Sequence, residues 1–251
     1  MHYIGDPHLQ LDSWEHQGLP DNCAVAAQTS IINQFLPNHE LSLDEANYIT
    51  AANGWYQPGN GTATDDVGKL FDVFDIPYHR VDHASLPQLV DELQAGHRII
   101  VGVHSAELWD QGPLAELWNW IQEVCGFDNS KFNPADHAVC VTGMDVSDPA
   151  NPKVVINDPG DPNGAGHLYP LGRFMDAWSN SDCFYVATNM APTVGATVGG
   201  LGGFDIGDYL GFGTTVVAAL MDTPISSALE AGALVTKFCH SVDWDAILAS
   251  I

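Results

Sequence analysis

A cysteine stands where a helix is predicted to begin, and a glutamine precedes it by six residues. The small and apolar run 24–35 predicts the helix, and Asp21 and Asn22 before it can cap free amides with a side-chain oxygen. Cys23 would then lie at the positive end of the helix dipole, where a thiolate is favoured. The spacing is typical of a thiol nucleophile with Gln17 as oxyanion donor. The alternative is that Cys23 is a small buried hydrophobic residue.

Two later segments offer a base for the thiol and a group that could orient the base. His137 begins a run that is typical of a buried strand. Residues 153–157 predict a second strand, which ends at Asp158 before a Pro-Gly break. If the two strands are antiparallel neighbours, His137 and Asp158 lie side by side, as an activated cysteine nucleophile needs.

In this combination the sequence resembles the papain-like cysteine peptidases. It is most similar to the branch that includes the bacteriocin-processing, double-glycine-cleaving peptidase domains and their stand-alone relatives. In that branch a Gln precedes the Cys by six residues, a His begins an apolar strand, and an Asp-Pro pair follows a short strand. All three elements occur here in the same order, within residues 1–190. Papain itself differs, because Gly-Ser precedes its Cys and an aromatic residue follows, where this chain has Asn22 and Ala24.

The third group of the site has two candidates. Papain uses an asparagine to orient the histidine, and this chain has both Asn157 and Asp158 at the end of the predicted strand. Strand alternation sends their side chains to opposite faces, so only one of them can reach His137. We predict Asp158, with Asn157 as the second candidate.

The resemblance implies a role for each residue. Cys23 would attack a carbonyl carbon and form an acyl-enzyme, with His137 as general base and then general acid. Asp158 would fix the imidazole, and the Gln17 amide would stabilise the oxyanion together with the Cys23 backbone amide. The predicted function is hydrolysis of peptide or other amide bonds in a peptide or protein substrate. The alternatives are transglutaminase-like acyl transfer and a non-catalytic module for peptide binding or assembly.

The predicted fold class is α+β and papain-like. A helical lobe carries Cys23 at a helix N-terminus, and an antiparallel sheet lobe follows it. A Ser42-to-Glu45 capping box and a second start at Ser85 mark further helices. Helices are predicted to begin near residues 42, 64, 85 and 171, and strands are predicted at 78–81, 98–103, 137–143, 153–157 and 184–187.

The chain changes character after the predicted peptidase domain, residues 1–190. Residues 191–213 are rich in glycine and predict a flexible linker. Residues 214–251 predict a helical extension with an apolar face that docks on the domain, on a second copy or on a partner. Gly199-Gly200 and Gly202-Gly203 resemble double-glycine cleavage sites, which makes self-processing a hypothesis.

Composition excludes several function classes. The 251 residues include 7 Lys and Arg against 32 Asp and Glu, a formal net charge of -25. Such acidity opposes binding to nucleic acid or to an anionic membrane surface. No run approaches the ~18 apolar residues of a spanning helix, and the N-terminus lacks a conventional signal peptide. An odd count of 5 cysteines is ordinary in a reducing compartment. We therefore expect a cytoplasmic protein, with signal-independent export as an alternative. The resemblance implies that it is a bacterial enzyme.

Other motifs are weaker. Residues 158–164 could offer oxygen ligands to calcium, but the EF-hand ligand pattern is missing and a plain loop is favoured. No zinc spacing occurs, and we expect neither metal nor cofactor. His104 is predicted to be structural, and the tryptophans at 109, 118 and 120 are predicted to be packing residues, with a substrate groove as the alternative.

Overall fold

The computed structural model describes residues 3–36, 40–109, 135–179 and 181–192. These residues lie in one compact unit with the bounds Met1–Val194. Nearly all of the predicted linker, the whole predicted extension with its double-glycine pairs, and the tryptophans at 118 and 120 lie outside the described residues.

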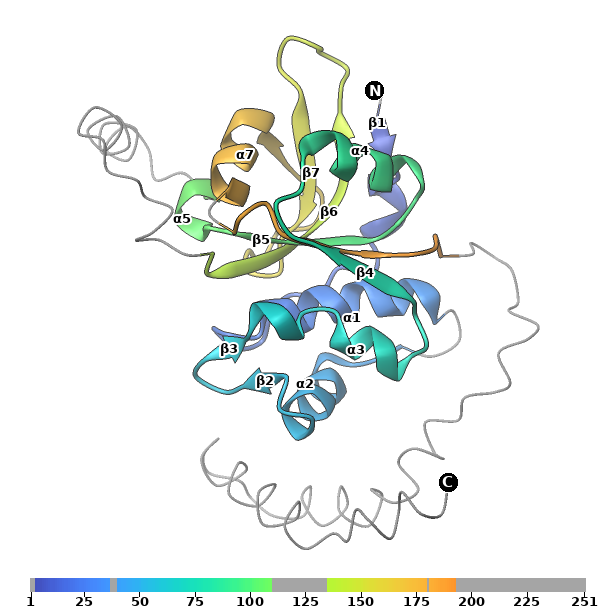
Figure 1. The fold of residues 1–251 in the computed structure, drawn as a ribbon, viewed down its shortest axis with the longest axis vertical. Helices are drawn as coiled ribbons and strands as arrows, with labels where there is room; N and C mark the ends of the chain where they lie inside the picture. Colours follow the sequence, from blue (N-terminus) through green and yellow to red (C-terminus); the bar gives the residue numbers. More distant parts are fainter. Residues whose placement is uncertain (1–2, 37–39, 110–134, 180, 193–251) are drawn as a thin grey trace, which may run out of the picture. The chain divides into compact units, whose positions relative to one another are not determined.

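An antiparallel sheet forms the centre of this unit, and its strands do not follow one another in chain order (Figure 1). The strand order is β4-β9-β5-β6-β7-β8, and β1 pairs with the far part of β6. The strands are β1 (Tyr3–Gly5), β4 (Tyr78–Val81), β5 (Ile99–Val103), β6 (His137–Asp145), β7 (Lys153–Asn157), β8 (His167–Pro170) and β9 (Tyr185–Thr188). A small separate hairpin consists of β2 (Tyr56–Gln57) and β3 (Gly61–Thr62).

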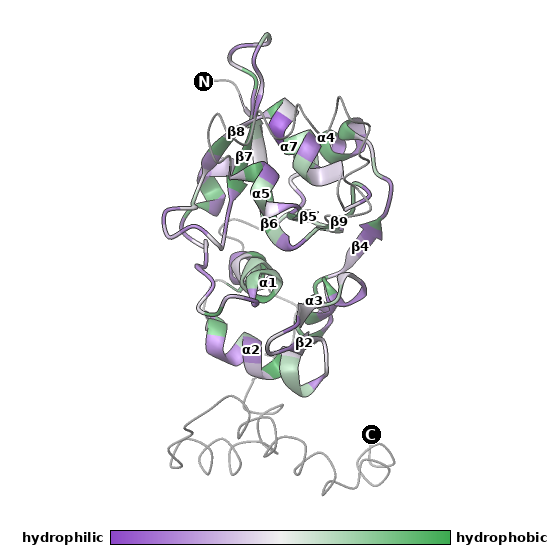
Figure 2. Cartoon of the chain, turned by 90° about the vertical axis from the view of Figure 1, so that its left-hand side faces the viewer, coloured by the Kyte–Doolittle hydropathy of each residue, from purple (hydrophilic) through white to green (hydrophobic). Residues whose placement is uncertain are grey.

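Helices cover both faces of the sheet. On one face lie α1 (Cys23–Phe35), α2 (Leu43–Ala52) and α3 (Lys69–Val73), and on the other lie α4 (Leu86–Gln94), α5 (Ser105–Leu108) and α7 (Leu171–Ser179). The described residues also form two short 3₁₀ helices, η1 (Pro7–Gln10) and η2 (Thr64–Asp66). Figure 2 shows α1 almost end-on, between the sheet on one side and α2 and α3 on the other.

The two hydrophobic cores follow the alternation of side chains along the strands. On β6, Val139 and Val141 pack into the core beneath α4 and α7, whereas Ala138 and Cys140 pack against α1. Successive strand residues point to opposite faces, so one strand serves both cores. The α1 helix is correspondingly buried from Ala24 to Ile32. The three polar residues of this run, at positions 28–30, donate side-chain hydrogen bonds to backbone carbonyls one turn earlier.

The predicted α+β class is confirmed, with the helices α1 to α3 preceding most of the sheet in the chain. The strands β1 and β8 and the β2–β3 hairpin were not predicted, because each has only two to four residues and too little pattern. The predicted helix from residue 64 is wrong in part. It divides into η2 and α3 at Gly68, whose φ is 102° and whose added Cβ would lie 2.7 Å from Tyr78. Within the described residues, none of the helices is both long and apolar enough to span a membrane.

Candidate active site

Cys23 is the first residue of α1 and is partly exposed. The predicted side-chain cap on this helix is wrong. Asn22 occupies the N-cap position without a capping hydrogen bond, because its Oδ1 accepts from the Leu19 amide at 3.1 Å. The Asp21 carboxylate is also used elsewhere, since it accepts hydrogen bonds from Tyr56 and from the Gly59 amide. The first amides of α1 therefore have no side-chain cap from either residue.

His137 begins β6 and lies next to the end of β7. Its Nε2 is 2.7 Å from Oδ1 of Asp158, and both side chains are buried. Cys23 and His137 line the same cavity. The site thus joins a helix start to a strand start and the residue after a strand end, and the helix start lies more than a hundred residues before the other two in the chain.

The surroundings of His137 favour its protonated form. Burial alone would lower the pKa of the imidazole, but the hydrogen bonds and charges of Asp158 and Cys23 outweigh burial and raise it to about 10. A protonated imidazole beside a thiol is the arrangement in which a thiolate is stabilised as one half of an ion pair.

Asp158 is fully buried, and its carboxylate accepts hydrogen bonds from several donors. Besides His137, the Trp109 indole donates to Oδ2 at 2.6 Å and the Gly160 amide donates to Oδ1 at 2.8 Å. Burial raises the pKa of the carboxyl group, but these hydrogen bonds hold it below its usual range. The backbone carbonyl of Asp158 accepts from the Trp14 indole at 2.9 Å, which fixes the loop after β7.

Asn157 points away from His137. Its Nδ2 donates to the Gln10 carbonyl at 2.7 Å, and its Oδ1 accepts from the Gly166 amide at 2.9 Å. Its side chain therefore ties the N-terminal segment and the β7–β8 loop to the sheet. Of the two candidates for the third group, Asp158 is the residue that contacts the imidazole.

Gln17 is placed near this loop by its backbone, because its amide donates to the Pro159 carbonyl at 2.8 Å. Its side-chain Nε2 donates to the Leu19 carbonyl at 3.0 Å. An amide NH₂ has two hydrogens, so one remains for a second acceptor. The Oε1 atom is buried and accepts no hydrogen bond from the described residues. Gln17 is not among the residues that line the cavity beside Cys23.

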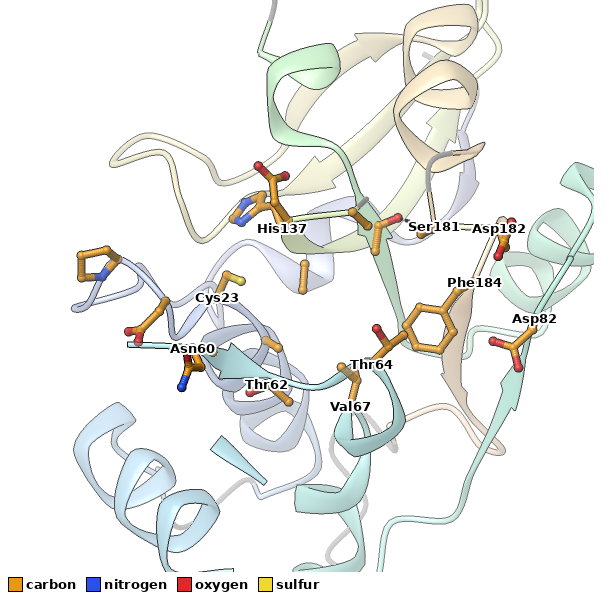
Figure 3. Close-up of a pocket in the computed structure, with 18 of the residues that line it drawn as sticks. Cys23, Asn60, Thr62, Thr64, Val67, Asp82, His137, Ser181, Asp182 and Phe184 are labelled. Atoms are coloured by element: carbon orange, nitrogen blue, oxygen red, sulfur yellow. Dashed lines mark hydrogen bonds between the residues drawn. The ribbon is translucent and has the colours of Figure 1, made fainter. Parts of the chain in front are cut away.

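A cavity of about 660 Å³ opens beside Cys23. Figure 3 shows Cys23 and His137 at one end of it and Asp82, Asp182 and Phe184 at the other. One wall comes from α1 and the β2–β3 hairpin, and the other comes from β5, β6 and the segment before β9. The described residues include no group of His, Cys, Asp or Glu side chains that could hold a metal ion.

Several residues that shape the site were not predicted. Asp136 accepts hydrogen bonds from the amide and hydroxyl of Ser105, which joins the start of β6 to the start of α5. Gly160 lies against His137 and Trp109, and a Cβ there would come within 2.9 Å of both rings. The sequence carried only weak signals for these contacts, because Asp before a strand and Gly after Pro are common in loops. His104 does not line the cavity and lies at the start of α5.

Comparison with known sequences finds relatives but no matching protein-family model. The chain is 27% identical over 209 residues to uncharacterized proteins of Mycobacterium bovis and Mycobacterium tuberculosis, covering 73% of this chain and 83% of each relative.

Among solved structures, the chain is similar to a Bacillus anthracis protein classed as a C39-like peptidase. The TM-score is 0.50 at 13% identity, over 77% of this chain and 100% of that one. It also matches the peptidase domain of Streptococcus ComA, a bifunctional ABC transporter, with a TM-score of 0.45 at 15% identity, over 71% and 97% of the two chains. The fold is therefore similar to that of a C39-like peptidase, which confirms the predicted resemblance at the level of the fold.

The charge of Asp158 is expected to control the protonation of His137. Asp158→Asn keeps an acceptor for the ring but removes the negative charge, so the pKa of His137 should fall from about 10. Histidine-labelled NMR titration measures this change. Asp161→Asn, in the same loop but paired with His167, is the matched control. An unaltered His137 titration in Asp158→Asn would contradict the electrostatic account.

Gly160→Ala is expected to disturb the site directly. The added methyl group would press on His137 and Trp109, and overpacking of this kind costs ~1–3 kcal/mol. We expect a lower thermal stability and slower alkylation of Cys23 by iodoacetamide. Gly172→Ala in α7 is the control, because a Cβ there meets nothing within 4 Å. Equal behaviour of the two variants would show that Gly160 is not needed for close approach.

Proposed function

We propose that this chain is a cysteine peptidase that hydrolyses amide bonds of a peptide or protein substrate. The observation that carries the proposal is the buried His137–Asp158 pair at the cavity that Cys23 lines from the start of α1. The C39-like fold supports the proposal, because a thiol nucleophile at a helix start opposite a histidine on a strand suits this architecture.

In the proposed reaction, the Cys23 thiol gives its proton to His137 and the sulfur attacks the carbonyl carbon of the scissile bond. The carbonyl oxygen becomes an oxyanion, which the Cys23 backbone amide and the second hydrogen of Gln17 Nε2 stabilise. As the tetrahedral intermediate collapses, the carbon–nitrogen bond breaks and His137 returns the proton to the leaving amine. An acyl-enzyme is left on sulfur.

Deacylation reverses the roles. A water molecule gives a proton to His137 and its oxygen attacks the thioester carbon. The carbon–sulfur bond then breaks, which releases the acid product, and His137 returns the proton to the sulfur. Asp158 supports both halves by holding the ring in one orientation and by favouring its charged form. Asn157 takes no part, since its amide is engaged by the Gln10 carbonyl and the Gly166 amide.

The same three side chains also suit acyl transfer to an amine, as in the transglutaminase alternative. The two activities differ only in what attacks the acyl-enzyme. Mass spectrometry of the products separates them, because hydrolysis yields a free acid and transfer to an added primary amine yields a new amide. The proposal expects the free acid as the main product.

Three substitutions test the assignment against a peptide library and labelled casein. Cys23→Ala should abolish turnover because the nucleophile is lost, and His137→Ala should come close to abolishing it. Gln17→Ala should lower kcat by roughly 10²- to 10³-fold and leave measurable activity, as expected for loss of one oxyanion donor. Folding is checked by circular dichroism. Full activity in Cys23→Ala would remove the proposal.

A further inference from the structure

Trp109 contacts both members of the His137–Asp158 pair. It follows α5 directly, and its indole N–H donates to Oδ2 of Asp158 at 2.6 Å. Its ring also packs on the His137 imidazole, with the ring centroids 5.2 Å apart at an interplanar angle of 58°. We infer that Trp109 is a positioning residue for the acid–base pair, which holds the Asp158 carboxylate in the one orientation that serves His137. This inference rests on the function proposed above.

The two oxygens of the carboxylate have different partners. Oδ1 accepts from His137 and from the Gly160 amide. Among the described residues, Trp109 is the donor that serves Oδ2. A carboxylate with both oxygens fixed cannot rotate about its last bond, so Oδ1 keeps facing the ring. Without the indole, a buried charged oxygen would lack a hydrogen bond, which is costly where solvent is excluded.

The packing around Trp109 supports a fixed geometry. Gly160 has no side chain at the place where the two rings approach each other, and a Cβ would lie within 2.9 Å of both. Trp109 is nonetheless 39% exposed as a residue, although its indole N–H is directed to a buried acceptor. Solvent next to Trp109 therefore weakens the stabilisation that the indole hydrogen bond gives to the charged carboxylate.

The groups around Asp158 determine in which direction its pKa changes when the indole donor is lost. The titratable groups around Asp158 are His137 and Cys140 on β6, Tyr169 on β8 and, beyond His137, Cys23. Burial raises the pKa of Cys140 to about 12 and, with nearby carboxylates, raises that of Tyr169. Both stay neutral below pH 8, so they do not titrate in an acidic assay. Loss of the indole donor should make Asp158 protonate at a higher pH, and His137 then loses its charged partner earlier on acidification.

Iodoacetamide alkylation of Cys23 tests the inference on the full chain without a known substrate. The rate is measured between pH 4 and pH 8, with site-resolved mass spectrometry to separate Cys23 from the other thiols. Trp109→Phe keeps an aromatic ring but removes the donor, and Trp109→Ala removes both. We expect the acidic limb of the profile to move to higher pH by the same amount in both variants. The rate at pH 5 should fall roughly threefold to tenfold, in keeping with the loss of one partly exposed charge-assisted hydrogen bond.

Trp14→Phe is the matched control. Trp14 also donates an indole hydrogen bond to Asp158, but to the backbone carbonyl and not to the carboxylate. We expect the acidic limb of the Cys23 alkylation profile in Trp14→Phe to coincide with that of the unmodified chain. A wild-type profile in Trp109→Phe, a shift in Trp109→Ala only, or an equal shift in Trp14→Phe would each overturn it.

His137→Ala separates this inference from the proposed function. If the alkylation rate of Cys23 does not depend on His137, the proposed function fails. If the rate depends on His137 but the limb does not move in Trp109→Phe, only the role of Trp109 fails.

Discussion

The packing of α1 against the face of β6 is the constraint on which the site depends. The thiol belongs to the helix and the imidazole to the strand, so their distance is set by how closely the two elements approach. Small residues make this approach possible, because Ala24 and Ala27 of α1 face Ala138 and Cys140 of β6 in one core. The Cys140 thiol even lies 3.4 Å from the Ala27 carbonyl. A larger side chain at this contact would separate the helix from the strand and the thiol from the ring.

The second requirement is a charged group in a place without water. A buried carboxylate is stable only when its oxygens are hydrogen-bonded and its charge is matched. Asp158 meets this condition through an imidazole, an indole and a backbone amide, which come from β6, the end of α5 and its own loop. The pair is therefore both a structural link between elements and the group that keeps His137 protonated. Removing any one donor is felt by the others, since they share one carboxylate.

The sequence predicted much of the fold and the central contact of the site. Long periodic segments were clear, so α1, α2, α4, β5, β6 and β7 begin and end close to the predicted residues. The strand alternation argument identified Asp158 as the residue beside His137, because only one of two adjacent strand residues can face the ring. The capping of α1 was wrong because other contacts took up both candidates: Asn22 accepts from the nearby Leu19 amide, and Asp21 binds the β2–β3 hairpin. Contacts such as Trp109 with Asp158 join residues far apart in the chain, and no local pattern predicts such a partner.

The N-terminal segment has a consequence for how the chain acquires its structure. β1 pairs with β6, Gln10 binds Thr142 and Asn157, Trp14 binds Asp158, and Gln17 binds Pro159. Each contact closes a loop of more than 130 residues, and such long-range contacts are slow to form. During synthesis the cysteine leaves the ribosome long before the histidine and the aspartate that complete its surroundings. The pair of His137 and Asp158 beside Cys23 therefore forms only after β6 and β7 have been made, and the first residues of the chain then close over these two strands.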